Sequence, residues 1–353
     1  MADQNHTGEM EVVEVREAHR FDEAVLTAYL SDNMDGFEGP IELRQFAGGQ
    51  SNPTFVMSAA SGEYVLRKQP PGELLPSAHR VDREYRVMSG LKGTGVPVPV
   101  MHHLCRDKEI IGTDFFVMEK IEGRVFHDPR LPGLDPAQRT AIYDQFIDTL
   151  AEMHMVDLAA QGLEEYGRPG NYFARQIDRW SQQYVASKTE EIPAMDSLMA
   201  WLAENVPESE EASIVHGDYR MGNCIIHPAE PKILAVLDWE LSTLGHPFAD
   251  VAYTCMGYHG DLIEDNFSGM DLAALGLPDE EYFLNRYSAR TKRGKIENWE
   301  FYVAFGGFRS AAIIQGVYKR GLEGIASSAG TERFAGKCAS RAASAWVLIK
   351  DYV

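Results

Sequence analysis

The stretch His216-Gly217-Asp218-Tyr219-Arg220-Met221-Gly222-Asn223 decides the fold class, together with the later run Val236-Leu237-Asp238-Trp239-Glu240. Phosphoryl transfer requires a group that orients the attacking hydroxyl and oxygen ligands that hold magnesium against the phosphates. An aspartate, an asparagine five positions later and a second aspartate after a following strand supply both. The pattern therefore predicts a kinase-type catalytic loop.

Each residue of this loop has its own expected role. Asp218 is the candidate catalytic base, and Asn223 and Asp238 are the candidate ligands of Mg²⁺, which prefers oxygen atoms. Taken alone, Asp218 could equally be a turn or helix-capping residue, and only its register with the other two favours catalysis. His216 more often braces such a loop by hydrogen bonds than performs chemistry. Asp250, near the start of a predicted helix, fits a scaffold residue that accepts backbone amides.

Upstream of the loop, the chain offers a candidate phosphate cradle. Glycines in the run 47–55 would let backbone amides approach ATP phosphates, although such a composition alone is also that of an ordinary turn. Strand alternation in 64–68 predicts that Arg67 faces inward and Lys68 away, so that Arg67 could pair with Glu84 on the next helix. The candidate nucleotide-binding residues are Gly48, Gly49, Ser51, Asn52, Arg67, Glu84 and Glu119.

Periodicity divides the chain into a strand-rich part and a helical part. A short helix is predicted over 21–30, then strands over 41–46, 54–59, 64–67, 98–104 and 115–121 with a helix over 79–91. Beyond residue 136 the pattern is mainly helical, interrupted by strand-like runs at 224–227 and 233–237. We therefore expect an α+β, bilobal, protein-kinase-like fold. Its small N-lobe (1–120) has a five-stranded antiparallel sheet and one helix, and its larger C-lobe (121–353) is mainly helical.

Composition limits the classes of partner. A formal charge of −20 disfavours nucleic acid and anionic membranes, which reward a basic surface. No apolar run approaches the roughly 20 residues of a membrane span, and residues 1–11 do not resemble a secretory signal, so we expect a cytoplasmic protein. The four cysteines are widely spaced in apolar contexts and are expected to be buried, reduced thiols. A monomer or homodimer is expected.

The span from about Phe46 to Tyr258 resembles the aminoglycoside-phosphotransferase superfamily of kinase-like proteins. Four runs, 49–55, 64–68, 192–195 and 237–247, are similar to the kinase-like region of certain acyl-CoA dehydrogenase fusion proteins and their stand-alone bacterial relatives. The resemblance implies ATP- and Mg²⁺-dependent phosphorylation of the hydroxyl of a 4-hydroxyacyl-CoA thioester, whose phosphate is later eliminated. It also implies a separate acyl-CoA dehydrogenase-like enzyme for that second step. Arg67 stands where the wider superfamily has lysine.

One basic cluster bears on the substrate. Five cations lie within ten residues, among them Arg286, Arg290 and Arg293, and the phosphates of an acyl-CoA could bind there. The alternative is a solvated helix C-terminus, where cations complement the helix dipole. Two other functions also remain open: a kinase for an aminoglycoside or another small alcohol such as choline or a sugar, and a catalytically silent nucleotide-binding module.

Overall fold

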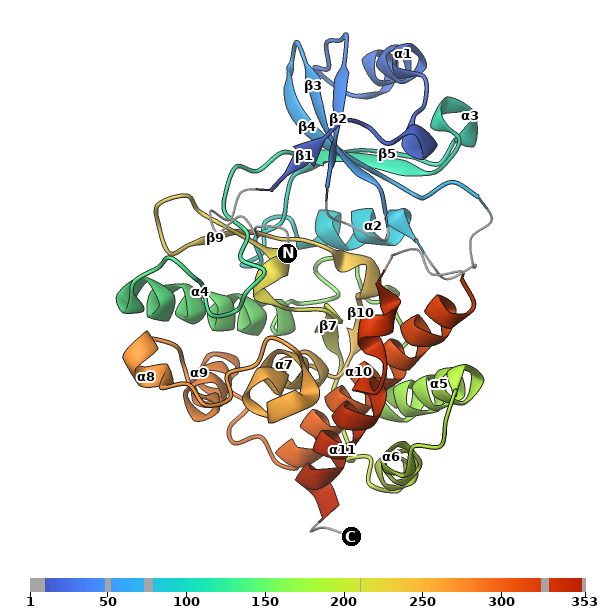
Figure 1. Ribbon diagram of the computed structural model, residues 1–353. Helices are drawn as coiled ribbons and strands as arrows, with labels where there is room; N and C mark the ends of the chain where they lie inside the picture. Colours follow the sequence, from blue (N-terminus) through green and yellow to red (C-terminus); the bar gives the residue numbers. More distant parts are fainter. Residues whose placement is uncertain (1–9, 48–51, 73–78, 210, 325–329, 351–353) are drawn as a thin grey trace. The chain divides into compact units, whose positions relative to one another are not determined.

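The computed structural model describes residues 10–47, 52–72, 79–209, 211–324 and 330–350. The chain divides into two compact units that are not continuous in sequence (Figure 1). Unit 1 comprises Met1–His127, Ala159–Leu163 and Met221–Ser242, and unit 2 comprises Asp128–Leu158, Glu164–Arg220 and Thr243–Val353. One boundary between the units therefore falls inside the stretch 216–223, between Arg220 and Met221.

Unit 1 is built on an antiparallel sheet of six strands in the order β1-β2-β3-β4-β6-β5. The strands are β1 (Val12–Val13), β2 (Glu42–Phe46), β3 (Thr54–Ala59), β4 (Gly62–Lys68), β5 (Met101–Cys105) and β6 (Phe115–Glu119). The five expected strands are all present. The sixth, β1, is a two-residue edge strand, and so short a segment shows no alternation in the sequence.

Helices cover both faces of this sheet. Helix α1 (Glu23–Asn33), capped by Asp22, buries Leu26 and Leu30 in the same apolar cluster as the strand residues Phe55 and Leu66. Helix α2 (Val81–Leu91) packs against β5 and β6 on the other face. A third, short helix, α3 (Lys108–Ile111), connects β5 to β6. Two adjacent residues of β4 therefore face different helices.

A small hairpin completes unit 1. Strands β8 (Cys224–Ile226) and β9 (Ile233–Val236) pair antiparallel, and Ile225 and Ala235 bury their side chains with Val125. A single 3-10 turn lies at each outer end of the hairpin: η2 (Met221–Asn223) precedes β8 and η3 (Trp239–Leu241) follows β9. Both strand-like runs predicted inside the helical half of the sequence are thus strands.

Unit 2 is mainly helical. The 24-residue helix α10 (Trp299–Leu322) is buried along most of its length, because its aromatic and alanine side chains contact α5, α7 and α11. The helices are α4 (Pro136–His154), α5 (Tyr172–Ser187), α6 (Pro193–Glu204), α7 (Phe248–Cys255), α8 (Leu272–Leu275), α9 (Glu280–Thr291), α10 and α11 (Lys337–Ile349). A two-stranded ribbon pairs β7 (Ser213–Val215) with β10 (Thr243–Gly245). The α+β kinase-like prediction is confirmed.

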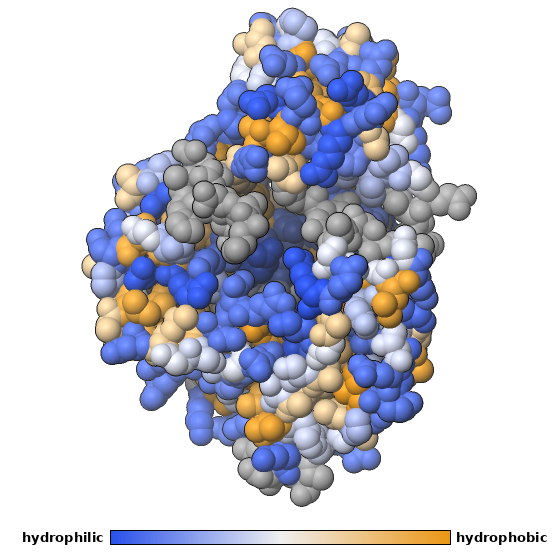
Figure 2. All heavy atoms as spheres, viewed as in Figure 1, coloured by the Kyte–Doolittle hydropathy of each residue, from blue (hydrophilic) through white to orange (hydrophobic). Residues whose placement is uncertain are grey.

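Burial agrees with the expected chemistry of the apolar residues. All four cysteines are free and buried, as the sequence predicts. Hydrophilic residues cover most of the face seen in Figure 2, and apolar residues appear there in small separate groups. Among the described residues, no helix combines the length and apolar character needed to cross a bilayer.

Candidate active site

The loop that follows β7 in unit 2 is held by one buried carboxylate, that of Asp250. The backbone N–H groups of His216 and Gly217 donate to the two oxygens of Asp250, at 2.6 and 2.8 Å. Gly217 has φ of +84°, a left-handed conformation that glycine adopts without a Cβ penalty. Two consecutive amides can therefore point at one carboxylate, and Asp218 follows at the exposed end of the turn.

Asp250 belongs to the first turn of α7 and is completely buried. Burial alone would raise its pKa, but hydrogen bonding to His154 and the Gly217 amide outweighs burial and lowers the pKa below the usual range. His154 Nε2 lies 3.5 Å from Asp250, and its Nδ1 lies 2.7 Å from the hydroxyl of Tyr287. These contacts support the scaffold role expected for Asp250. They also give His154, which is buried on α4, hydrogen-bond partners at both ring nitrogens.

His216 has no exposed surface. The Asp218 N–H donates to Nδ1 of His216 at 3.2 Å, so the imidazole fixes the backbone of the residue expected to act as base. The same ring packs edge-on against Tyr219. This geometry supports the bracing role, since the ring is enclosed by protein.

Two residues that sequence reasoning missed also hold the loop. The hydroxyl of Tyr253, on α7, donates to Oδ1 of Asp218 in a short hydrogen bond. Arg309, on α10, donates to the carbonyl of Gly217 at 2.8 Å, and its guanidinium lies over the Tyr253 ring at 5.8 Å. Tyr253 lies one helical turn after Asp250, a spacing from which it could have been found. Arg309 gives no such signal, because only the tertiary fold brings α10 to the loop.

The two candidate metal ligands lie together in unit 1. The Leu237 N–H donates to the carbonyl of Asn223 at 2.8 Å, which extends the β8–β9 pairing by one step and places Asn223 and Asp238 at the same end of the hairpin. Asp238 has φ of +65°, a conformation that costs a non-glycine residue energy and that clusters at functional sites. One amide and one carboxylate therefore belong to the same end of the hairpin.

Arg67 connects that hairpin to the sheet. Its Nη2 lies 2.7 Å from Oδ1 of Asp238 and its Nε lies 3.0 Å from Oε2 of Glu84. Glu240 lies 3.8 Å from the same guanidinium. Burial disfavours the charge, but these carboxylates raise the Arg67 pKa above its ordinary value. Lys68 instead faces the α1 side, 5.6 Å from the Phe21 ring, so the alternation argument assigned the two side chains correctly.

Glu84 is 1% exposed, and burial raises its pKa to about 7 although Arg67 favours the ionised form. Asn52 has no exposed surface. Its amide donates to Glu84 at 2.9 Å, and its carbonyl lies 3.1 Å from Nδ1 of His79. Asn52 therefore holds Glu84, and its expected contact with the nucleotide stays a prediction. Glu119 accepts the N–H of Val100 at 3.1 Å at the end of β6. Gly48, Gly49 and Ser51 lie outside the described residues.

The basic cluster on α9 is engaged by acids within unit 2. Arg286 forms a two-pronged ion pair with Asp148 at 2.8 and 2.9 Å, and Arg290 lies 3.3 Å from Glu152. Nε of Arg293 donates to Glu211 at 2.6 Å. Both acids from α4 and the loop acid Glu211 thus neutralise the cations that the sequence offered for substrate phosphates. These ion pairs compensate Arg286, Arg290 and Arg293, and their expected role in substrate binding stays a prediction.

The comparisons with known proteins place this chain in a class. Residues 42–283, more than half of the chain, match the model of the phosphotransferase enzyme family, and the chain belongs to that family. A solved protein of Ralstonia eutropha JMP134, named only provisionally as an aminoglycoside phosphotransferase, is 48% identical with a TM-score of 0.86, and the match covers 94% of this chain and 99% of that one. Aminoglycoside phosphotransferase APH(4)-Ia, solved with AMP-PNP and hygromycin B, shares the fold at 16% identity and a TM-score of 0.58, with 91% and 97% covered.

The curated relatives that match in sequence are longer proteins than this chain. The chain is 48% identical over 311 residues to acyl-CoA dehydrogenase family member 10 of Mus musculus, covering 87% of this chain and 29% of the relative. It is 41% identical over 336 residues to acyl-CoA dehydrogenase family member 11 of Homo sapiens, covering 93% and 43%. The chain thus spans less than half the length of these curated relatives.

Proposed function

We propose that this phosphotransferase uses ATP and Mg²⁺ to phosphorylate the hydroxyl of a 4-hydroxyacyl-CoA-type thioester. The observation that carries the chemistry is the placement of Asn223 and Asp238 at one end of the β8–β9 hairpin, with Arg67 against Asp238. Asp218, five residues before Asn223, supplies the base. The substrate class rests on the relatives named as acyl-CoA dehydrogenase family members and on the sequence resemblance to their kinase-like region.

The donor set fits magnesium. Asn223 and Asp238 offer an amide and a carboxylate oxygen, and Mg²⁺ is commonly held by one or two protein oxygens, with phosphates and waters completing the shell. When bound, the ion would orient the ATP phosphates and offset their charge. The Arg67 guanidinium, already against Asp238 and Glu84, has donors of the geometry that grips phosphate oxygens.

The chain's own residues then have distinct tasks in the transfer. Asp218 accepts the proton of the substrate hydroxyl as that oxygen forms a bond to the γ-phosphorus, and the bond from the γ-phosphorus to the ADP oxygen breaks. Tyr253 and the His216 brace keep the Asp218 carboxylate in one orientation. The products are ADP and the phosphorylated thioester, which an acyl-CoA dehydrogenase-like activity would consume by eliminating phosphate.

The direct test is a panel assay of ATP-dependent phosphorylation against 4-hydroxyacyl-CoA thioesters, aminoglycosides, choline and sugars. We expect turnover of the thioesters, and an Asp218→Asn variant that lowers kcat by about 10²- to 10⁴-fold. Asp271→Asn, which changes a helix-capping aspartate on α8, is the control and should retain activity. Turnover of an aminoglycoside but of no thioester would reject the substrate class, and full activity of Asp218→Asn would reject the mechanism.

A further inference from the structure

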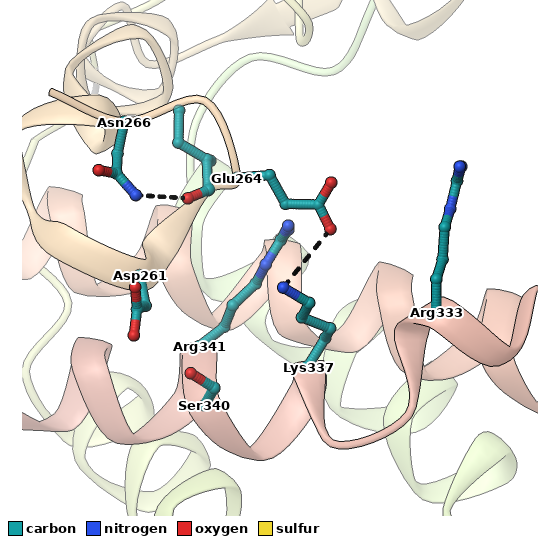
Figure 3. A pocket seen from close by; sticks show the side chains of 8 residues that line it. Asp261, Glu264, Asn266, Arg333, Lys337, Ser340 and Arg341 are labelled. Carbon is teal, nitrogen blue, oxygen red and sulfur yellow. Dashed lines mark hydrogen bonds and ion pairs between the residues drawn. The ribbon is translucent and has the colours of Figure 1, made fainter. Parts of the chain in front are cut away.

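Unit 2 contains a cavity of about 550 Å³ beside the start of α11 (Figure 3). One wall is formed by η5 (Gly260–Leu262), which contributes Asp261, and by the loop that follows it, which contributes Glu264 and Asn266. The other wall is formed by η6 (Thr331–Phe334) and α11, which contribute Arg333, Lys337 and Arg341. The space is large enough for part of a small-molecule ligand.

Two of the cations share a helix face, because Lys337 and Arg341 are four residues apart on α11. Arg333 belongs to η6 and stands apart from them in Figure 3. Nζ of Lys337 lies 3.8 Å from Glu264, which also acts electrostatically on Arg341. Three cations thus face two acids in a chain of formal charge −20. Such a wall disfavours a polycationic ligand and favours an anion.

Arg341 is the most informative member because it is only 9% exposed. Its Nη1 donates to the Ser310 hydroxyl, and across the described parts of the chain no carboxylate lies within ion-pair distance of it. Burial lowers its pKa from the ordinary value. A buried guanidinium with a neutral partner is costly, and an incoming anion would offset that cost.

The cavity is coupled to the residue that holds the base. The Tyr253 hydroxyl donates to Asp218. Arg309 lies over the Tyr253 ring, and its neighbour Ser310 is the hydrogen-bond partner of Arg341. This series of contacts within unit 2 connects Arg341 in the cavity wall to Asp218.

We propose that this cavity binds an anionic group of the acceptor substrate, a phosphate or a carboxylate, through Arg333, Lys337 and Arg341. The inference rests on the proposed function, because it takes Asp218 as the site where the acceptor hydroxyl reacts. It assigns the recognition of the acceptor's charge to α11, whereas the cations of α9 are already paired with protein acids.

Matched acceptors and variants test the assignment. One 4-hydroxyacyl group is supplied as the free acid, as the neutral N-acetylcysteamine thioester and as the coenzyme A thioester. We expect the neutral thioester to have a KM at least tenfold above that of an anionic acceptor. A preference for the coenzyme A thioester identifies phosphate as the bound group, and a preference for the free acid identifies carboxylate.

The variants are Arg333→Gln and Lys337→Gln, singly and together, since Arg341 is buried and its loss could unfold the chain. We expect the double variant to raise KM for the anionic acceptor at least tenfold, with kcat, the KM for ATP and the KM for the neutral thioester within twofold of wild type. Arg320→Gln, which removes an exposed cation of α10, should change none of these values. Equal use of neutral and charged acceptors, or an unchanged KM in the double variant, overturns the proposal.

The assays distinguish an error in the proposed function from an error in the proposed role of the cavity. If wild type phosphorylates none of the three acceptors, the kinase assignment to this substrate class fails, and the acceptor role of the cavity fails with it. If wild type phosphorylates them but the double variant still prefers the anionic acceptor to the neutral thioester, only the assignment of the cavity fails. Competition by free coenzyme A against the acceptor, lost in the double variant, supports the assignment through binding alone.

Discussion

Arg67 contacts more acidic groups than its place on an ordinary strand suggests. One guanidinium lies within ion-pair distance of Glu84, Asp238 and Glu240, which belong to a helix and to the hairpin end. The planar fork makes this possible, because Nε and Nη2 point in different directions and each serves a separate carboxylate. An ammonium group at this position would be a single point charge.

Replacement of Arg67 by lysine should therefore be far from conservative. Arg67→Lys keeps the charge but cannot hold Glu84 and Asp238 at once, so we expect kcat/KM for ATP to fall by on the order of tenfold or more. Steady-state kinetics with varied ATP measure the effect. Lys68→Arg, on the opposite face of the same strand, is the control. Unchanged kcat/KM in Arg67→Lys would mean that a point charge suffices.

Glu84 gives this network a pH dependence. Burial raises its pKa from 4.5 to about 7 in the folded protein, so its contribution to stability is fully present below about pH 4.5 and is lost as pH rises through about 7. The side chain in Glu84→Gln cannot ionise, so this variant should not lose stability as the pH rises through about 7. Urea unfolding between pH 5 and 8 should show the stability of wild type falling relative to the variant as pH increases. Parallel curves would show that Glu84 does not titrate there.

At the scale of an element, α7 organises the catalytic loop. Its first turn carries Asp250, which accepts two loop amides, and its next turn carries Tyr253, which donates to Asp218. The short helix thus fixes both the backbone of the loop and the side chain at its tip. The conformation of the catalytic loop therefore depends on contacts with helix α7 as well as on the loop's own sequence.

Asp250→Asn tests this dependence. The amide replaces one accepting oxygen by a donor that faces a backbone N–H, so we expect the free energy of unfolding to fall by about 2–4 kcal/mol and activity to fall with it. Chemical denaturation measures the loss. Asp279→Asn is the matched control: Asp279 caps α9 by accepting a single amide, and its replacement should cost about 1 kcal/mol or less. Equal losses in the two variants would contradict the anchoring role.

The sequence predicted those parts of the structure that local patterns encode. Strand alternation predicted that the Arg67 side chain faces inward, and helical periodicity placed α1 and α2 within a few residues of their observed ends. Tyr253 could have been found from its spacing after Asp250, but Arg309 could not, because only the tertiary fold brings α10 to the loop. The pairing of Arg286 and Arg290 with α4 acids was missed for the same reason, since those partners lie more than a hundred residues away.

For the whole molecule, the predicted catalytic base and the predicted metal ligands belong to different units. Asp218 belongs to unit 2, whereas Asn223 and Asp238 belong to unit 1, although the chain joins Asp218 to Asn223 directly. The base and the metal ligands can therefore be probed separately, provided that the measurement does not depend on turnover. Stability in the presence of nucleotide is such a measurement.

Nucleotide that binds only the folded chain stabilises it by mass action, by about 2.7 kcal/mol when its concentration is a hundredfold above Kd. We expect ADP with Mg²⁺ to raise Tm more than ADP alone, and the difference between the two is the metal-dependent increment. Asn223→Ala should abolish this increment because it removes a magnesium ligand, and Asp238→Asn should reduce it because a charged oxygen ligand becomes a neutral one. Asp218→Asn should keep the increment because its carboxylate serves the acceptor, and it is therefore the matched control.

Calorimetry of each variant with and without ADP and Mg²⁺ makes the comparison. Each increment is measured within one variant, so the loss of the Arg67–Asp238 ion pair, which changes the stability of the ligand-free chain, cancels. A full increment in Asp238→Asn would remove Asp238 from the metal site. A lost increment in Asp218→Asn would make that residue a metal ligand instead of the base, because only a group that binds the ion can change a stabilisation measured without acceptor and without turnover.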